Sequence, residues 1–172
     1  MKEPIVIVDT NDVPMGVTDR NAVNYETQIY RVSALWLVNT KGDVLIAQRK
    51  LTKKKDPGLW GPSVAGTVEQ GETYEQNIEK EVSEEIGLND ITLHAVTKTY
   101  VDEPRKYFCK WFTATVDWTG TSNFVIQEEE VEAIAWAPYE ELLEDYRNSP
   151  AKYIPSFGQS LEVLETIRTG LI

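Results

Sequence analysis

The sequence has little of the chemistry that disulfide-bonded and zinc-binding proteins use. Its 172 residues include one cysteine, Cys109, and one histidine, His94. A single cysteine excludes an intramolecular disulfide, which fits a reducing compartment. Two such side chains are also too few for a zinc site built from Cys and His ligands. We expect both to be structural, with Cys109 packed in a core or a sheet, as unpaired cysteines usually are.

Positive charge and long apolar runs are also scarce. The formal net charge is −11, from 28 acidic and 17 basic residues. Such a chain gains little from counterion release, so we expect no DNA or RNA partner. The apolar run Ile5 to Val8 is too short for a signal peptide, and no stretch reaches the ~20 apolar residues of a membrane span. We therefore expect a cytoplasmic protein with no membrane partner, and any anionic substrate would need local cations or metal ions.

The sequence does contain a regular order of strand and helix patterns. Strands are predicted over residues 5–8, 13–17, 30–38, 44–48, 63–65, 91–100, 105–116 and 131–136. Helices are predicted over residues 74–86, 139–146 and 157–169. No repeat, linker or low-complexity tract divides the chain. We predict one α/β (α+β) domain over residues 1–172, with a mixed β-sheet between helices; its oligomeric state is left open.

The clearest predicted helix, residues 74–86, has both a start and a stop signal. Thr73 and Gln76 form a capping-box pattern at its beginning. Gly87 can adopt the left-handed conformation that ends a helix. Apolar residues recur at every fourth position from Tyr74 onward, which predicts that one side of the helix faces the core.

Three glutamates lie on one face of this helix. Glu81, Glu84 and Glu85 are spaced i, i+3 and i+4. Like charges at this spacing cost about 0.2–0.5 kcal/mol per pair on an isolated helix. A divalent cation would reverse that repulsion, and Mg²⁺ prefers oxygen ligands. From spacing alone, a solvated acidic face and a magnesium site both remain open.

The helix and the loop before it resemble the Nudix box. That family motif reads Gly, five residues, Glu, seven residues, then Arg-Glu-apolar-any-Glu-Glu-any-Gly-apolar. The matching positions here are Gly66, Glu72, Lys80, Glu81, Val82, Glu84, Glu85, Gly87 and Leu88. Every specified position agrees except Lys80, where the family has Arg. The chain thus resembles a Nudix protein, and the resemblance implies an α/β/α sandwich.

The resemblance also implies roles for the box residues. The carboxylate ligands of Mg²⁺, which Mn²⁺ could replace, would be Glu81, Glu84 and Glu85, with Glu84 also counted among the catalytic residues. The backbone carbonyl of Gly66 would be a further ligand. Glu72 and Lys80 would brace the loop against the helix. Lysine keeps the positive charge of arginine but lacks its planar, two-pronged donor geometry.

Beyond the box, the chain resembles the Nudix branch that contains isopentenyl-diphosphate isomerases as well as hydrolases. The similar segments are residues 6–16, 41–49 and 153–157. The isomerases need a catalytic Cys shortly after the equivalent of Trp60, and a metal-binding His two residues beyond it. Ala65 and Thr67 occupy those positions here. A methyl and a hydroxyl group cannot perform that proton chemistry, so we expect hydrolysis.

The function implied by the resemblance is Mg²⁺-dependent hydrolysis of a phosphoanhydride bond. The substrate would be a nucleoside diphosphate-linked compound or a related small diphosphate. Two alternatives stay open: an enzyme like the isomerases, and a Nudix module that binds nucleotides with weak or no turnover. The second alternative rests on Lys80.

Candidate substrate-binding residues come from the charge pattern on the strands. Arg31 and Arg49, on predicted strands, are the main candidates, because a charge inside a sheet needs a reason. The run of Lys50, Lys53, Lys54 and Lys55 could hold phosphates or form a solvated loop. Trp60 and Tyr100 could stack on a base, although core packing is the commoner role of such aromatics.

The general base is predicted outside the box, because the helix glutamates would hold metal. In residues 127–136, alternation along a strand would place Glu128, Glu130 and Glu132 on one face. The branch resemblance favours Glu130, with Glu128 as second choice. An acidic loop that only solvates the surface is the alternative interpretation.

Overall fold

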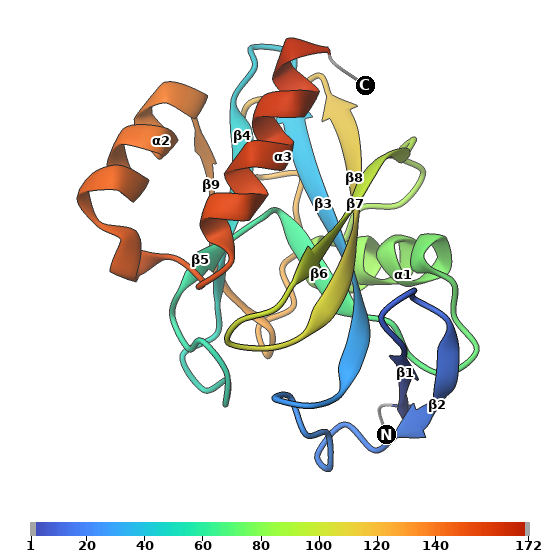
Figure 1. Ribbon diagram of the computed structural model, residues 1–172. Coiled ribbons are helices and arrows are strands. Elements are labelled where there is room, and N and C mark those ends of the chain that lie inside the picture. Colours follow the sequence, from blue (N-terminus) through green and yellow to red (C-terminus); the bar gives the residue numbers. More distant parts are fainter. Residues whose placement is uncertain (1–2, 171–172) are drawn as a thin grey trace.

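The computed structural model describes residues 3–170 (Figure 1). Its strands are β1 (Ile5–Val8), β2 (Pro14–Thr18), β3 (Ile29–Asn39), β4 (Val44–Arg49), β5 (Trp60–Gly61), β6 (Val64–Thr67), β7 (His94–Val101), β8 (Tyr107–Val116) and β9 (Val131–Ala137). Its helices are α1 (Tyr74–Ile86), α2 (Tyr139–Asn148) and α3 (Phe157–Thr169), with a short 3₁₀ turn, η1 (Pro150–Lys152). None of the helices in this part of the chain is long and apolar enough to cross a membrane.

The long strand β3 organises the sheet. It pairs in parallel with β8 along its whole length, from Tyr30 opposite Tyr107 to Asn39 opposite Val116. It pairs antiparallel with β1, β4 and β6. The pairs β1–β2, β7–β8, β4–β5 and β4–β9 extend the sheet from there. The predicted mixed sheet is confirmed.

Helices cover both faces of the sheet, because the side chains of β3 alternate between two cores. Leu35 and Leu37 pack in the cluster that contains the buried face of α1. Ala34 and Trp36 pack in the other cluster, with residues of α2 and α3. Figure 1 shows α1 on one side and α2 and α3 on the other. The α/β/α sandwich expected from the resemblance is confirmed.

Helix α1 has the bounds and caps predicted for it. The Thr73 hydroxyl accepts from the backbone N–H of Gln76 at 3.2 Å, and the Gln76 side chain accepts from the N–H of Thr73 at 2.9 Å. Gly87 ends the helix with φ of +68°. The buried residues include Tyr74, Ile78 and Val82 of the expected stripe.

Some strand predictions were wrong in their bounds. β7 begins at His94 and not at residue 91, because residues 91–93 do not pair with β8, and β8 begins at Tyr107 and not at residue 105. The strand predicted over 63–65 is β6 (Val64–Thr67), and a further short strand that was not predicted, β5 (Trp60–Gly61), precedes it across Pro62 and Ser63. Pro62 has no N–H to donate to a ladder. The Ser63 hydroxyl instead links two strands, donating to Leu45 O at 2.7 Å and accepting from Leu37 N at 2.8 Å.

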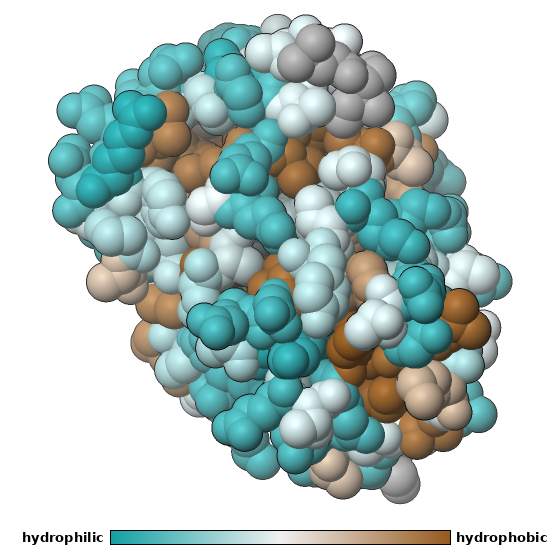
Figure 2. All heavy atoms as spheres, in the orientation of Figure 1, coloured by the Kyte–Doolittle hydropathy of each residue, from teal (hydrophilic) through white to brown (hydrophobic). Residues whose placement is uncertain are grey.

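The β1–β2 hairpin carries an exposed apolar row. Val13, Met15 and Val17 are 54%, 74% and 47% exposed. Figure 2 shows an apolar area at the lower right, where Figure 1 has this hairpin. The remainder of this face is mostly hydrophilic, as the acidic composition leads one to expect.

Candidate active site

Two glutamates of α1, Glu81 and Glu85, contact strand β6. A Cβ added to Gly66 would lie 2.2 Å from Cγ of Glu81, so only glycine allows this approach. One turn further along, Glu85 Oε2 accepts from the N–H of Ala65 at 3.4 Å. The structure therefore brings together three predicted ligands, Gly66, Glu81 and Glu85.

A cavity of about 50 Å³ adjoins Glu85. Glu85, Glu130 and Arg49 contribute charged side chains to its lining, and Ala65 contributes a methyl group. The volume admits a few water molecules, since one needs roughly 10–15 Å³ by this kind of measure. Two predicted residues from other elements, Arg49 of β4 and Glu130 before β9, thus meet Glu85 of the box at this cavity.

Glu85 lies near two other carboxylates, those of Glu81 and Glu130. Burial raises the pKa of this carboxyl to about 8, and the neighbouring charges of Glu81 and Glu130 act in the same direction. The N–H of Ala65 and the charge of Arg49 oppose the shift. A divalent cation at this position would relieve the repulsion among the three carboxylates.

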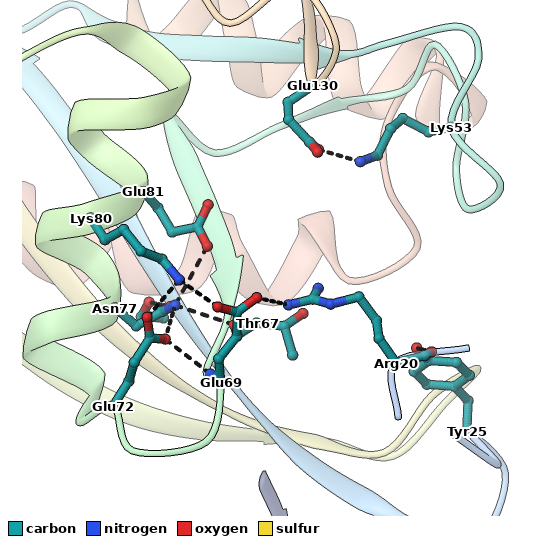
Figure 3. A network of polar contacts seen from close by, with 11 residues as sticks. Arg20, Tyr25, Lys53, Thr67, Glu69, Glu72, Asn77, Lys80, Glu81 and Glu130 are labelled. Carbon is teal, nitrogen blue, oxygen red and sulfur yellow. Dashed lines mark hydrogen bonds and ion pairs between the residues drawn. The ribbon is translucent and has the colours of Figure 1, made fainter. Parts of the chain in front are cut away.

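Lys80 lies in a chain of ion pairs, shown in Figure 3. Its Nζ is 2.5 Å from Glu72 Oε1 and 2.9 Å from Glu69 Oε2. The other oxygen of Glu69 accepts from Arg20 Nη2 at 2.8 Å. Burial opposes the charge on Lys80, but the bonds to Glu72 and Glu69 outweigh it and raise the pKa of Lys80. Glu72 and Lys80 are thus in direct contact, with Arg20 and Glu69 as partners that the sequence did not indicate, and their bracing role stays a prediction.

Glu130 is held beside the basic loop. The carboxylate of Glu130 is ion-paired with Lys53, and its backbone carbonyl accepts from the N–H of Lys50 at 2.9 Å. Figure 3 shows Glu81 projecting from α1 and Glu130 reaching down from the segment before β9. Residues 128–130 form a turn, with the N–H of Glu130 bonded to Gln127 O at 2.9 Å. The prediction that Glu128, Glu130 and Glu132 alternate along one strand was therefore wrong.

Two further glutamates of the predicted set face solvent. Glu84 is exposed on α1, and Glu128 is exposed in the turn before β9. Neither lines the cavity that contains Glu85 and Glu130. Their roles as metal ligand and second-choice base stay predictions, and Glu130 is the better placed of the two base candidates.

Arg31 is occupied elsewhere. Its Nε donates to Asp12 Oδ1 at 2.7 Å, its Nη2 donates to Asp12 O at 2.5 Å, and its guanidinium lies 5.2 Å from the centre of the Tyr74 ring. Asp12 also accepts from Lys98 Nζ at 2.6 Å. The charge on this strand has its partner in the β1–β2 loop. Arg31 is therefore engaged by Asp12 in this structure, and its contact with substrate stays a prediction.

A group of cations surrounds Lys55. Lys55 Nζ lies 3.0 Å from the centre of the Tyr25 ring, and Arg49 Nε donates to the carbonyl of Lys55 at 3.1 Å. Burial lowers the pKa of Lys55 to about 8, and the positive charges of Arg105, Arg20 and Arg49 lower it further. Like charges gathered in this way favour an anion between them. Sequence reasoning included Lys55 and Arg49 but missed Arg20 and Arg105, which lie far from them along the chain.

The two aromatic candidates differ in burial, since Trp60 is half-buried and Tyr100 is 38% exposed. Trp60 is half-buried against the α2–α3 core cluster. The ring of Tyr100 lies 5.0 Å from that of Phe108, and its hydroxyl donates to Asp102 at 3.3 Å. Cys109 is buried in β8 as expected, whereas His94 is exposed at the start of β7.

The acidic side chains do not form a closed metal cage. Within residues 3–170, no three His, Cys, Asp or Glu side chains converge closely enough to enclose an ion by themselves. Mg²⁺ does not require such a cage, because it usually keeps several waters and shares one or two carboxylates with substrate phosphates. The donor set of Glu81, Glu85 and the Gly66 carbonyl fits that open mode of binding.

Comparisons with known proteins show which family this chain is similar to. The family model described as NUDIX domain matches residues 27–157. An uncharacterized Nudix hydrolase of Pseudomonas aeruginosa is 30% identical over 162 residues, covering 94% of this chain and 92% of the relative. An isopentenyl-diphosphate Delta-isomerase of Corynebacterium diphtheriae is 30% identical over 183 residues, covering 98% of this chain and 96% of the relative. The crystal structure of DR0079 from Deinococcus radiodurans has a TM-score of 0.77 at 23% identity, covering 95% of this chain and 98% of that one.

Proposed function

Because the chain belongs to the Nudix family, we propose that it hydrolyses a phosphoanhydride bond in a nucleoside diphosphate-linked compound or a related small diphosphate, with Mg²⁺ as cofactor. The family and the hydrolase class predicted from the box are confirmed by these relatives. The observation that carries the finer proposal is the meeting of Glu81 and Glu85 of α1 with Gly66, Arg49 and Glu130. One domain over residues 1–172 and a cytoplasmic location stay predictions.

The carboxylates and the carbonyl supply the oxygen donors that Mg²⁺ prefers. Glu81 and Glu85 would hold it together with the carbonyl of Gly66, and Mn²⁺ could take its place. When bound, the ion would polarise phosphoryl oxygens and lower the pKa of the attacking water. Glu84, exposed on the same helix, would complete the set from the solvent side.

Cations around Lys55 explain how so acidic a protein could bind an anion. Arg49 reaches the cavity with Glu85, while Arg20 and Arg105 lie near Lys55. Glu69 and Asp56 partly offset this positive charge, through ion pairs with Arg20 and Arg105. A phosphate chain lying between these cations and a Mg²⁺ ion held by α1 would have its negative charge compensated on both sides.

Glu130 is the group we assign as general base. It would take a proton from the attacking water while the water oxygen bonds to phosphorus and the bridging P–O bond breaks toward the leaving phosphate. It lines the cavity beside Glu85, and its carboxylate is ion-paired with Lys53. Glu128 remains the second candidate.

Isomerisation is the alternative that the relatives raise, since hydrolase and isomerase match this chain equally well by identity. The residues at the two positions that the isomerases need distinguish the two activities, whereas the percentage identities do not. Ala65 contributes only a methyl group to the cavity, and Thr67 cannot replace an imidazole ligand. Incubation with isopentenyl diphosphate and Mg²⁺ should therefore yield no dimethylallyl isomer; formation of the isomer would contradict this assignment.

The test of hydrolysis is a substrate panel with nucleoside di- and triphosphates, nucleotide sugars, dinucleotides and small non-nucleotide diphosphates. We expect release of phosphate or of a nucleoside monophosphate from at least one class. EDTA should abolish it, and added Mg²⁺ or Mn²⁺ should restore it. Tight binding of a nucleotide without turnover would favour the non-catalytic module, and full turnover in excess chelator would refute the metal mechanism.

The metal ligands are tested by isosteric substitution on α1. Glu81→Gln and Glu85→Gln remove one charge each at nearly constant volume, so turnover should fall sharply while the fold survives. Glu79→Gln, at an exposed position on the same helix, is the matched control. If all three variants turn over substrate at the wild-type rate, the glutamates of α1 are only a solvated acidic face.

A further inference from the structure

Asn77 is a polar residue on the buried face of α1. Its exposed fraction is 0%, and it lies one turn before Glu81. Burying an amide without partners costs roughly 1–3 kcal/mol, so its contacts must compensate. An apolar side chain would avoid that cost in the same space. The partners of the amide therefore indicate what it does.

All the donor contacts of Asn77 go to groups around the proposed metal ligands. Its Nδ2 lies 2.9 Å from Glu72 Oε2, 3.2 Å from Thr67 O and 3.4 Å from Glu81 Oε1. The amide has two hydrogens for these three acceptors, so they are shared. Figure 3 shows Asn77 at the centre of this arrangement. It connects the carboxylate of Glu81 to the end of β6, directly after Gly66.

Ser33 determines which way the amide faces. The Ser33 hydroxyl donates to Oδ1 of Asn77, and Ser33 is itself 0% exposed. With Oδ1 engaged there, Nδ2 must face Glu72 and Glu81. A flipped amide would bring its oxygen against two carboxylates and leave Ser33 without its acceptor.

We propose that Asn77, oriented by Ser33, is a positioning residue that holds the Glu81 carboxylate beside Gly66 and so sets the affinity of the site for a divalent cation. The inference rests on the proposed role of Glu81 as a metal ligand. Partners that orient a metal ligand from outside typically change metal affinity by about 10–100-fold when they are removed. A residue that only fills the core would not have that effect.

The test is Mn²⁺ binding, measured by the electron paramagnetic resonance signal of the free ion, which requires no turnover. Asn77→Ala should raise the dissociation constant for Mn²⁺ by about 10-fold or more, and Ser33→Ala should raise it by less. At saturating Mn²⁺, kcat should fall in both while KM for the diphosphate changes little. Ser83→Ala is the matched control, because Ser83 is exposed on α1 and contacts Asn89 instead.

A folded Asn77→Ala variant that binds Mn²⁺ with wild-type affinity would overturn the inference and leave Asn77 as a packing residue. If that variant does not fold, Ser33→Ala decides, because it removes one hydroxyl and leaves Asn77 in place; wild-type affinity there would likewise overturn the inference. Wild-type protein that binds no Mn²⁺ would overturn the proposed function, so the two failures are distinguishable.

Discussion

At the scale of single residues, the charged side chains divide into those neutralised by the fold and those gathered at the site. Asp12 with Arg31, and Glu72 with Lys80, are ion pairs that hold loops in place. Glu85 instead has carboxylates as its neighbours, and its pKa is raised. Repulsion between carboxylates that the fold holds together indicates a binding site for a cation, whereas ion pairs between opposite charges indicate a role in stabilising the fold.

Asp12 is the residue for which this division predicts a dependence on pH. Its side chain is 6% exposed. Burial opposes its charge, but Lys98 and Arg31 outweigh burial and hold the pKa of Asp12 below 3.8. A carboxyl with a lowered pKa in the folded state stabilises the protein above the unfolded pKa, and that contribution is lost as pH falls through the folded pKa.

We therefore expect Asp12→Asn to lower the free energy of unfolding by about 1.5–3 kcal/mol at pH 7, the usual worth of hydrogen bonds to a charged group. Asparagine tolerates the φ of +63° found here, so the substitution isolates the charge. The difference from wild type in urea unfolding should shrink below about pH 4. Asp90→Asn, at an exposed position with φ of +60°, is the control; a difference that does not change with pH would contradict the prediction.

Glu130 and Glu129 are neighbours with different surroundings. Glu130 lines the cavity, whereas Glu129 is exposed in the same turn. General-base catalysis typically contributes about 10²–10⁴-fold, so Glu130→Gln should lower kcat by that factor with a much smaller change in KM. Glu129→Gln should be nearly silent. Wild-type kcat in Glu130→Gln would move the assignment to Glu128 or to a glutamate of α1.

At the scale of elements, α1 and β6 form the site because their backbones approach closely. That approach depends on Gly66, where an added Cβ would meet Glu81 at 2.2 Å. Gly66→Ala should displace the Glu81 side chain, weaken Mn²⁺ binding and lower kcat, while the fold is retained. Gly16→Ala, at a glycine whose added Cβ would meet nothing within 4 Å, is the control. Equal Mn²⁺ affinity in both variants would show that Glu81 has room to adjust.

Local signals explain why α1 could be predicted so closely. Thr73, Gln76 and Gly87 act within one turn of the helix ends, and the structure has both caps where the sequence indicates them. The spacing of the glutamates follows from the helix alone. That Glu81 and Glu85 lie on Gly66 and Ala65 could be expected only through the family resemblance, because helical spacing does not say which strand a helix packs against.

Contacts distant in sequence were beyond such reasoning. Arg31 was expected to bind substrate because a charge inside a sheet needs a reason, and its ion pair with Asp12 of the β1–β2 loop could not be read from the sequence. Arg20 reaches Glu69 from a segment without regular structure, so no periodicity could have indicated it. Glu128 was placed by strand alternation, which fails because the strand begins at Val131.

At the scale of the whole molecule, cations can stabilise the protein in two ways. They can screen the net charge of −11, or one ion can bind at the acidic site. Diffuse self-repulsion is reduced by any salt, since the Debye length is about 10 Å at 0.1 M ionic strength. A site that binds one ion in the native state adds a stabilisation of RT ln(1 + [L]/Kd), about 2.7 kcal/mol at 100 times Kd. The two effects can be separated by comparing salts at equal ionic strength.

We expect MgCl₂ to raise the Tm more than NaCl does at the same ionic strength. For a chain of this length, about 2.7 kcal/mol corresponds to a shift of roughly 5–10 °C. The excess should disappear when Glu81→Gln and Glu85→Gln are combined, because the site then loses two charges, whereas Glu79→Gln should keep it. The double variant without metal should be at least as stable as wild type, since repulsion at Glu85 is removed. If Mg²⁺ and Na⁺ raise the Tm equally, the acidic helix face only adds to the diffuse charge of the molecule, and the metal must be sought elsewhere or arrive only with the substrate.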